Sequence, residues 1–402
     1  MNNLIKNLIV LLLIVFVACS KNEEGDVYSS LGTEVDKARL EAAGHSLFTN
    51  IGELSDTKFA KLSAGLMDMM ADNSNSSNKR VVHSIAELGM SMANEESICD
   101  HFEAIEGISR NGEESLSSLW QDGKGTWEWD SEINDFIRVS ETDEEIIYKL
   151  PSSKESISND LILRIYDFEV YDGDFPGKGE ELEDGTIVTE MISSLFFEMK
   201  LQDELVATSN INVDISNSGD IENVVMTFNP LPFSFQMEAV NANDHSKWRY
   251  SFLNDSEVVF EHLLYAEIAG TSEYMMIRKG QSSIQIKDIK MVASVEGNGF
   301  VTELALIEKL GLTGEIWAKS MADAVNKHVD MKVRYVSDNA IIAKAIAFPS
   351  NTNMDDNDWF VNFLLQFNDG SEISAEDFFE DDLSKFEIEF EDFLCDVEDR
   401  LK

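Results

Sequence analysis

The chain has 402 residues, of which 43% are hydrophobic and 24 are phenylalanine. This composition provides a core for one large or two modest domains and argues against a disordered stalk. The chain carries 31 basic and 76 acidic residues, a formal net charge of −45. Phosphate backbones repel a polyanion of this size, so the charge argues against a nucleic-acid partner. We expect a solvated acidic surface.

The N-terminus predicts an export signal and a lipid anchor. Lys6 precedes an unbroken apolar run over residues 8–18, which is too short to span a bilayer as a helix. The segment Phe16-Val17-Ala18-Cys19 resembles the lipobox of bacterial lipoproteins, with Phe16 in place of the commoner leucine. The resemblance implies that residues 1–18 are removed and that acyl chains on Cys19 anchor the protein to a membrane. The alternative is a buried cysteine at the end of an ordinary signal or anchor helix.

The residues after Cys19 bear on where the protein is displayed. Residues 19–32 are the predicted lipidated cysteine and a polar tether, with Glu23, Glu24 and Asp26 at its start. This acidic stretch resembles the export tag of surface-exposed lipoproteins of the Bacteroidota. The resemblance implies an outer-membrane lipoprotein that faces outward. A solvated tether that happens to be acidic is the alternative in so acidic a chain.

The apolar pattern predicts an α+β fold with N-terminal helices. Over residues 33–115 apolar residues recur at intervals of three and four residues, which is typical of helices. We expect helices over 35–47, 59–70 and 81–98. From about residue 120 to 296 the period changes to two, which predicts an antiparallel meander sheet or β half-barrel. The predicted strands lie at 127–129, 136–139, 146–150, 161–171, 195–201, 211–215, 224–228, 233–237, 248–252 and 258–265.

Residues 297–402 are predicted to form an α+β cap. A helical period over 301–325 is interrupted at 311–314, strands are expected within 331–348 and 359–367, and residues 368–371 form a turn. Ser374 and Asp377 resemble a capping box that starts a C-terminal amphipathic helix. We expect its phenylalanine stripe to pack on the open face of the sheet. The sheet-plus-helix pattern is similar to bacterial half-barrel carriers of lipids and lipoproteins, which implies an apolar ligand.

One segment resembles a calcium-binding loop. Asp172, Asp174, Glu180 and Glu183 fall at EF-hand spacing, although Pro176 replaces the oxygen ligand of the fifth position. The flanking residues are predicted strands rather than helices. The sequence therefore leaves two interpretations open, a Ca²⁺ site or an ordinary acidic hairpin loop.

Two further cysteines remain after Cys19. Cys99 and Cys395 lie near the two ends of the predicted folded region. Outside the cytoplasm such a pair can oxidise, and a bond that closes so long a loop contributes about 4–5 kcal/mol in the chain-entropy model. Two buried free thiols fit the sequence equally well.

Familiar catalytic motifs are missing from the sequence. It contains no HExxH, GxSxG, P-loop or GxGxxG motif. Trp127 with Trp129, and Trp248 with Tyr250, are candidates for a carbohydrate platform or for the core of the sheet. The sequence favours a membrane-anchored surface lipoprotein that is a non-enzymatic binding or structural module, with an apolar ligand, a glycan or a partner such as an outer-membrane protein. The alternative is a carboxylate-dependent hydrolase of extracellular polymers.

Overall fold

The chain divides into two compact units in the computed structural model. Among the described residues, unit 1 comprises residues 27–49, 240–252 and 257–374, and unit 2 comprises residues 50–239 and 253–256. The structure describes residues 27–70, 78–79, 81–82, 116–142, 144–175, 178–179, 189–216, 219–242, 244–271, 274–351 and 359–374.

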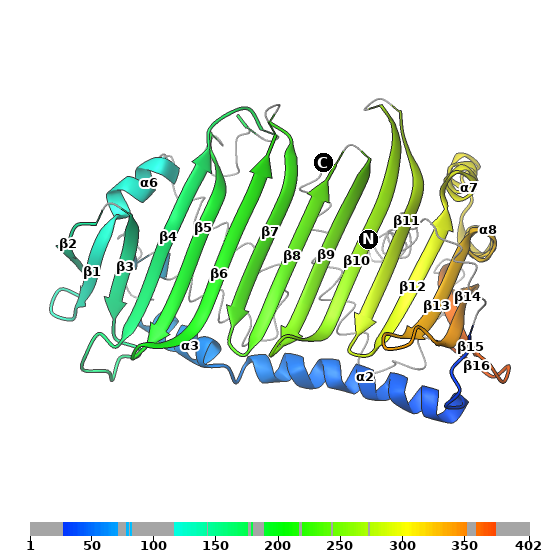
Figure 1. The fold of residues 1–402 in the computed structure, drawn as a ribbon, viewed down its shortest axis with the longest axis horizontal. Coiled ribbons are helices and arrows are strands. Elements are labelled where there is room, and N and C mark those ends of the chain that lie inside the picture. Colours follow the sequence, from blue (N-terminus) through cyan, green and yellow to red (C-terminus); the bar gives the residue numbers. More distant parts are fainter. Residues whose placement is uncertain are drawn as a thin grey trace. The chain divides into compact units, whose positions relative to one another are not determined.

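The fold is mixed α+β, as the sequence predicted, and the described residues form mainly antiparallel strands with a few helices (Figure 1). In unit 2 the strands are neighbours in chain order from β3 to β8, with β1 between β3 and β2, and in unit 1 they are neighbours in chain order from β9 to β16. The β1–β3 pair is parallel. The strands of unit 2 are β1 Gly125–Asp130, β2 Asp135–Ser140, β3 Glu145–Leu150, β4 Leu161–Tyr171, β5 Met191–Leu201, β6 Glu204–Ile215, β7 Ile221–Pro230 and, mostly, β8 Phe233–Asn241.

Strands β5 and β6 of unit 2 are joined by a tight turn. Gln202 and Asp203 join β5 to β6 with positive φ angles of 50° and 69°. Two consecutive left-handed residues are typical of a two-residue hairpin turn whose twist matches that of the strands. Such turns keep β5 and β6 in continuous antiparallel register except for one bulge between Met199 and Lys200.

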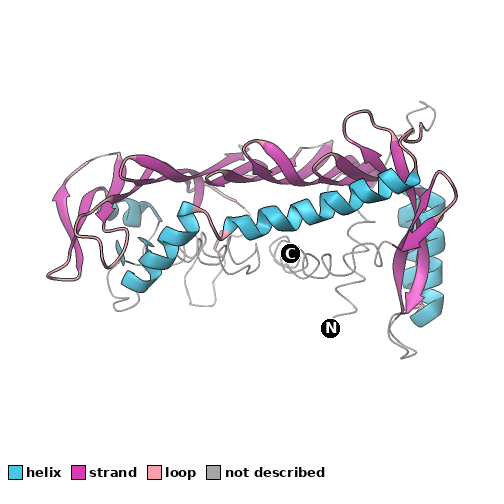
Figure 2. Ribbon diagram, turned by 90° about the horizontal axis from the view of Figure 1, so that it is seen from below, coloured by secondary structure: helices cyan, strands magenta, loops and turns pink. Residues whose placement is uncertain are grey.

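Helix α3 (Lys58–Met70) covers one face of the strands of unit 2 (Figure 2). Thr57 caps the helix, because its hydroxyl accepts a hydrogen bond from the backbone N–H of Ala60 at 3.1 Å. Phe59, Leu62 and Leu66 follow the helical period and are buried. They meet the buried side chains of the strands, among them Tyr148, Leu150, Leu161, Leu163, Phe197, Met199 and Phe228.

Unit 1 contains helix α2 (Thr33–Leu54) over most of its length, and the strands β9 to β16. These strands are β9 His245–Asn254, β10 Glu257–Thr271, β11 Tyr274–Ile286, β12 Ile289–Glu296, β13 Val329–Tyr335, β14 Ile341–Asn351, β15 Trp359–Phe367 and β16 Glu372–Ser374. Leu40 and Ala43 of α2 share a buried cluster with residues of β12 to β15. The first turn of α2 is also tied to β13, because buried Asp36 accepts hydrogen bonds from the hydroxyls of Tyr335 and Ser29, both at 2.8 Å.

Two further helices of unit 1 follow β12. Helices α7 (Gly297–Lys309) and α8 (Gly314–His328) are separated where the sequence predicted an interruption, and Gly311 and Gly314 both have a φ of +59°. Buried Met321 and Val325 of α8 pack with Phe300 of α7. No helix among the described residues is both long and apolar enough to cross a membrane.

The structure refines two sequence predictions. Residues 331–348 contain the end of β13 and most of β14, with a turn between them at which Asn339 has a φ of +61°. Residues 120–123 were expected to begin the strands, but they complete helix α6 (Leu116–Gly123). The predicted helix over 81–98, apart from residues 81 and 82, and the predicted C-terminal helix lie outside the described residues.

Candidate binding site

Helix α6 of unit 2 is fixed at both ends. At its N-terminus the Glu190 carboxylate accepts a hydrogen bond from the backbone N–H of Ser117 at 2.8 Å. A carboxylate is favoured there by the positive end of the helix dipole. At its C-terminus the indole N–H of Trp127 donates to the carbonyl of Gly123 at 2.7 Å. These two contacts define the orientation of α6 and of Trp120 on it.

A cavity of about 450 Å³ lies between α6 and β4. Its aromatic wall consists of Trp120 and Phe168, whose rings stack with centroids 4.8 Å apart and planes at 25°. The volume lies within the range of sites that hold small molecules. The remaining wall is polar except for Val170, and its polar residues are Ser117, Gln121, Lys124, Glu144, Asp167 and Glu169.

A β-bulge shapes the wall that β4 contributes. Between Tyr166 and Glu169 the strand β4 advances three residues while β5 advances two. Asp167 stands at this extra position with a φ of +52°, and its side chain is exposed. Bulges redirect side chains and often occur beside functional sites. Here the bulge carries Phe168 to Trp120 and leaves the carboxylate of Asp167 at the cavity.

Strands β3 to β7 carry a second surface, formed by alternate residues whose side chains point away from the core. We call this set the polar face; its members are Glu145, Ile147, Arg164, Tyr166, Phe196, Glu198, Lys200, Thr208, Asn210, Thr227 and Asn229. None of these residues is fully buried. Trp120 of the cavity, by contrast, packs against the core cluster of unit 2, which the polar face avoids.

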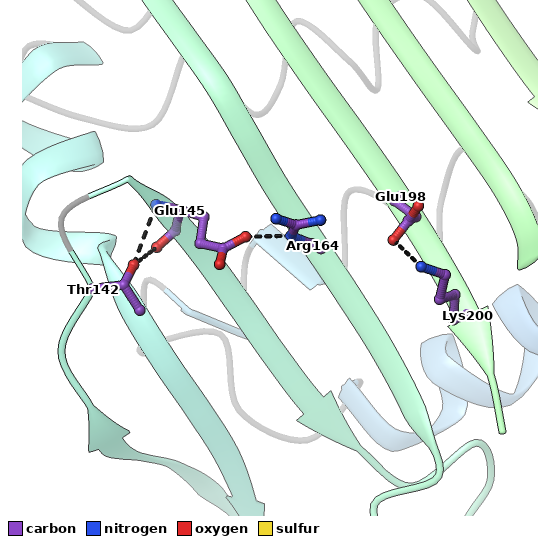
Figure 3. Close-up of polar contacts among 5 residues, drawn as sticks. All are labelled: Thr142, Glu145, Arg164, Glu198 and Lys200. Carbon is purple, nitrogen blue, oxygen red and sulfur yellow. Dashed lines mark hydrogen bonds and ion pairs between the residues drawn. The ribbon is translucent and has the colours of Figure 1, made fainter. Parts of the chain in front are cut away.

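The charged residues of the polar face are paired with one another (Figure 3). Arg164 donates to Glu145, and Lys200 lies 2.6 Å from Glu198. The hydrogen bond with Glu145 raises the pKa of Arg164, and partial burial followed by the charge of Glu198 raises the pKa of Tyr166. The phenol of Tyr166 is therefore a neutral donor and acceptor at physiological pH.

No protein-family model, curated protein or solved structure matches this chain. The geometry of the cavity and the polar face is therefore the basis for assigning a function.

Part of the predicted calcium loop is described. Asp172 and Asp174 are exposed in the segment after β4, whereas Glu180 and Glu183 lie outside the described residues. The Lys178 ammonium lies 2.7 Å from the carbonyl oxygen of Gly173 and also donates to that of Asp172. In the described part of the chain no group of three or more acidic, histidine or cysteine side chains is arranged to hold a metal. Calcium binding stays a prediction.

The lipid and disulfide predictions cannot be located in the fold. Cys19, Cys99 and Cys395 all lie outside the described residues. Lipidation of Cys19 and a bond between the other two remain predictions for chemical tests.

The predicted aromatic platforms lie mostly against the core. Trp127 and Trp129, like Trp120 of the cavity, are partly buried against the core cluster of unit 2. In unit 1 Tyr250 is 4% exposed, whereas Trp248 is partly exposed. The sequence prediction missed Trp120 and Phe168. Every second residue of β4 from Leu161 faces the core, so a regular strand would bury residue 167. An aspartate does not fit a buried position, and this misfit is the sequence signal of the bulge.

Proposed function

We propose that the protein is a membrane-anchored surface lipoprotein whose body binds a glycan in the α6 cavity without catalysis. The stacked pair Trp120 and Phe168 beside six polar side chains carries this proposal. Sugars bind through their C–H faces on aromatic rings and through hydrogen bonds from their hydroxyls. Carboxylates accept such bonds, and the Gln121 amide and Ser117 hydroxyl both donate and accept. The lipobox resemblance at Cys19 supports the anchor, and the acidic stretch that follows it, which resembles an export tag, supports the outer-membrane location.

The charge of the cavity narrows the class of glycan. Glu144, Asp167 and Glu169 provide three carboxylates, against the single ammonium of Lys124. This excess of negative charge, in a chain of net charge −45, repels sulfated and uronic-acid polymers. The cavity therefore suits a neutral or amine-bearing sugar. The polar lining of the cavity favours such a sugar over an apolar ligand. The half-barrel carrier of an apolar ligand that the sequence pattern suggested stays a prediction.

A panel of neutral, basic and acidic polysaccharides tests the proposal by affinity electrophoresis of the full chain. The protein is kept in a polyoxyethylene detergent, because alkyl glycosides would compete for the site. We expect retardation by a neutral or amino-sugar polymer, with affinity reduced about tenfold or more in Trp120→Ala because a stacking surface is lost. Gln121→Ala changes an exposed side chain and should weaken binding about fivefold through one lost hydrogen bond.

Trp359→Ala serves as the matched control, because Trp359 is a half-buried tryptophan of unit 1. Its binding should equal that of the unaltered chain. Failure of every polymer to retard the unaltered chain would overturn the proposal, as would equal affinities of the unaltered chain, Trp120→Ala and Gln121→Ala.

The three carboxylates of the cavity favour one second candidate, a hydrolase that cleaves the bound glycan. Incubation of the retained polymer with the protein should then release reducing ends. Asp167→Asn, Glu169→Gln or Glu144→Gln would reduce that release about a hundredfold or more while leaving retardation in the gel in place. Binding without release of reducing ends excludes this candidate.

The anchor has its own test. Growth with an alkynyl fatty acid should label the chain, and Cys19→Ser should abolish the label and release the protein from membranes. Protease added to whole cells should remove the protein if it is displayed outward. An unlabelled chain would refute the anchor without bearing on the cavity.

A further inference from the structure

We propose that the acidic C-terminal segment of the chain, residues 375–402, docks on a basic face of unit 1 through ion pairs. We call this set of side chains the basic face; its members are Lys290, Lys332, Arg334 and Lys344. The inference concerns unit 1 and does not rest on the glycan proposed for the α6 cavity.

The strand register gathers the four cations on one side of strands β12 to β14. Lys290 of β12 lies directly opposite Arg334 of β13, and Lys332 of β13 lies directly opposite Lys344 of β14. Residues directly opposite each other in antiparallel strands share a face, with Cβ atoms about 5 Å apart. Because residues 332 and 334 are two positions apart on one strand, all four side chains share this face. All four are partly exposed.

The other side of the same strands carries the core of unit 1. Val333 and Ala343 lie opposite each other and belong to the buried cluster that contains Leu40 of α2. Met331 shares a second buried cluster with Val325 of α8. Helices α2 and α8 therefore pack on the side of these strands that faces away from the four cations.

Four neighbouring cations are unexpected in a chain with 31 basic and 76 acidic residues. Like charges directly opposite each other destabilise a sheet. Two carboxylates lie near them on the same side. Asp330 is 2.7 Å from the Lys332 ammonium, and Glu372 accepts a hydrogen bond from the Gln366 amide at 2.8 Å. The four cations outnumber these two carboxylates, so a further anionic group that lies on the basic face stabilises it.

The C-terminal segment has the complementary charge and pattern. Residues 375–402 lie outside the described residues, and their sequence contains twelve acidic and three basic residues. Beside the basic face, Ile346 and Leu364 lie directly opposite each other on the same side and are partly exposed. The phenylalanine stripe of the predicted helix suits this apolar pair, while its carboxylates suit the cations.

Chain length and position also favour this segment. The chain enters it after Ser374 of β16, which pairs with Leu364. Strand β14 is two strands away from β16 and β12 is four, which is about 10 Å and 19 Å. A helix of 28 residues is about 42 Å long, so it reaches all four cations. The acidic loop after Asn351 begins about 23 Å along β14 from Lys344 and is less suited.

Zero-length cross-linking of the full chain with a water-soluble carbodiimide tests the contact, because this reagent joins a carboxylate to an amine only where the two groups touch. A mixture of isotopically light and heavy chains separates bonds within one chain from bonds between copies, and mass spectrometry maps them. We expect bonds within one chain from the C-terminal segment to the three lysines of the basic face. Lys309 and Lys319, which are exposed on α7 and α8, should not be joined to the segment.

Charge variants test whether ion pairs hold the segment. Lys290→Gln combined with Lys344→Gln should lower the yield of bonds between the segment and Lys332 about tenfold or more. Lys309→Gln combined with Lys319→Gln removes the same charge elsewhere in unit 1 and should leave the yield unchanged. Sodium chloride at about 1 M should lower the yield in the unaltered chain, because salt screens exposed ion pairs. The salt measurement preserves the test if the first double variant fails to fold.

The remaining outcomes overturn the inference. Bonds that join only light to heavy chains assign the basic face to a second copy. Lysines of the basic face that are joined only to carboxylates outside the segment, or to none, refute docking. Equal yields in the unaltered chain and in Lys290→Gln with Lys344→Gln refute the ion pairs. Binding to vesicles that requires phosphatidylglycerol in place of phosphatidylcholine, with no bonds to the segment, assigns the face to an anionic membrane.

Discussion

Buried His262 makes the stability of unit 1 depend on pH in a calculable way. His262 lies on β10, is 2% exposed, and burial lowers its pKa from 6.5 to about 4. Between these two values the unfolded chain binds a proton that the folded chain rejects. The stability associated with a neutral His262 is therefore fully present above the unfolded pKa and is lost as the pH falls toward the folded pKa.

The size of the effect follows from the two pKa values. A shift of this size corresponds to about 3 kcal/mol in full, of which about 2 kcal/mol is lost on acidification to about pH 5. His262→Leu removes the titrating group, so the variant should lose about 2 kcal/mol less than the unaltered chain over this range. The prediction concerns how steeply the free energy of unfolding changes with pH. It is independent of how the substitution changes the free energy of unfolding at neutral pH.

Urea unfolding followed by circular dichroism, at several pH values from 7.5 down to about 5, measures this slope. Phe260→Leu is the matched control, because it alters another buried side chain of β10 and leaves the imidazole in place. Its slope should equal that of the unaltered chain. Parallel loss of stability in His262→Leu and the unaltered chain would refute the reasoning.

Three other substitutions test the contacts that hold each unit together, with urea unfolding at pH 7.5 as the measurement. Tyr335→Phe removes a donor from buried Asp36 and should lower the free energy of unfolding by about 1–3 kcal/mol, whereas no change would show that the bond contributes nothing. Leu163→Ala opens a cavity in the core of unit 2 and should cost about 2–5 kcal/mol, and a smaller cost would place Leu163 outside the core. Arg249→Met leaves the carboxylate of Glu261, 10% exposed, without the cation 2.7 Å away. We expect a loss of about 1–3 kcal/mol, since Arg249 itself is half exposed, and unchanged stability would contradict the role of the pair.

Local patterns predicted most of the elements because each rests on neighbouring residues. Helix α3 and strand β4 each bury one face. Burial of one face places apolar residues at intervals of three and four residues in α3 and at every second residue in β4, and the sequence shows both patterns. The break between α7 and α8 was likewise predicted, because glycines stand at 311 and 314; in the structure both have a φ of +59°.

The candidate site was not predicted because it arises from contacts distant in sequence. Trp120 and Phe168 come together from α6 and β4, where β4 has a bulge at Asp167 and α6 is held by Glu190 and Trp127. The rows of the polar face depend in the same way on the register of five strands. The alternation of apolar and polar residues along a strand predicts the face on which a residue lies. It does not predict which residue of the neighbouring strand lies beside it.

Hydrogen–deuterium exchange of the full chain, with and without the oligosaccharide that binds best, tests the central claim most directly. Our account predicts protection in peptides that contain residues 116–125, 144–150 and 164–171, which carry the cavity wall. Protection confined to unit 1, or no protection at saturating ligand, would contradict a glycan site at helix α6.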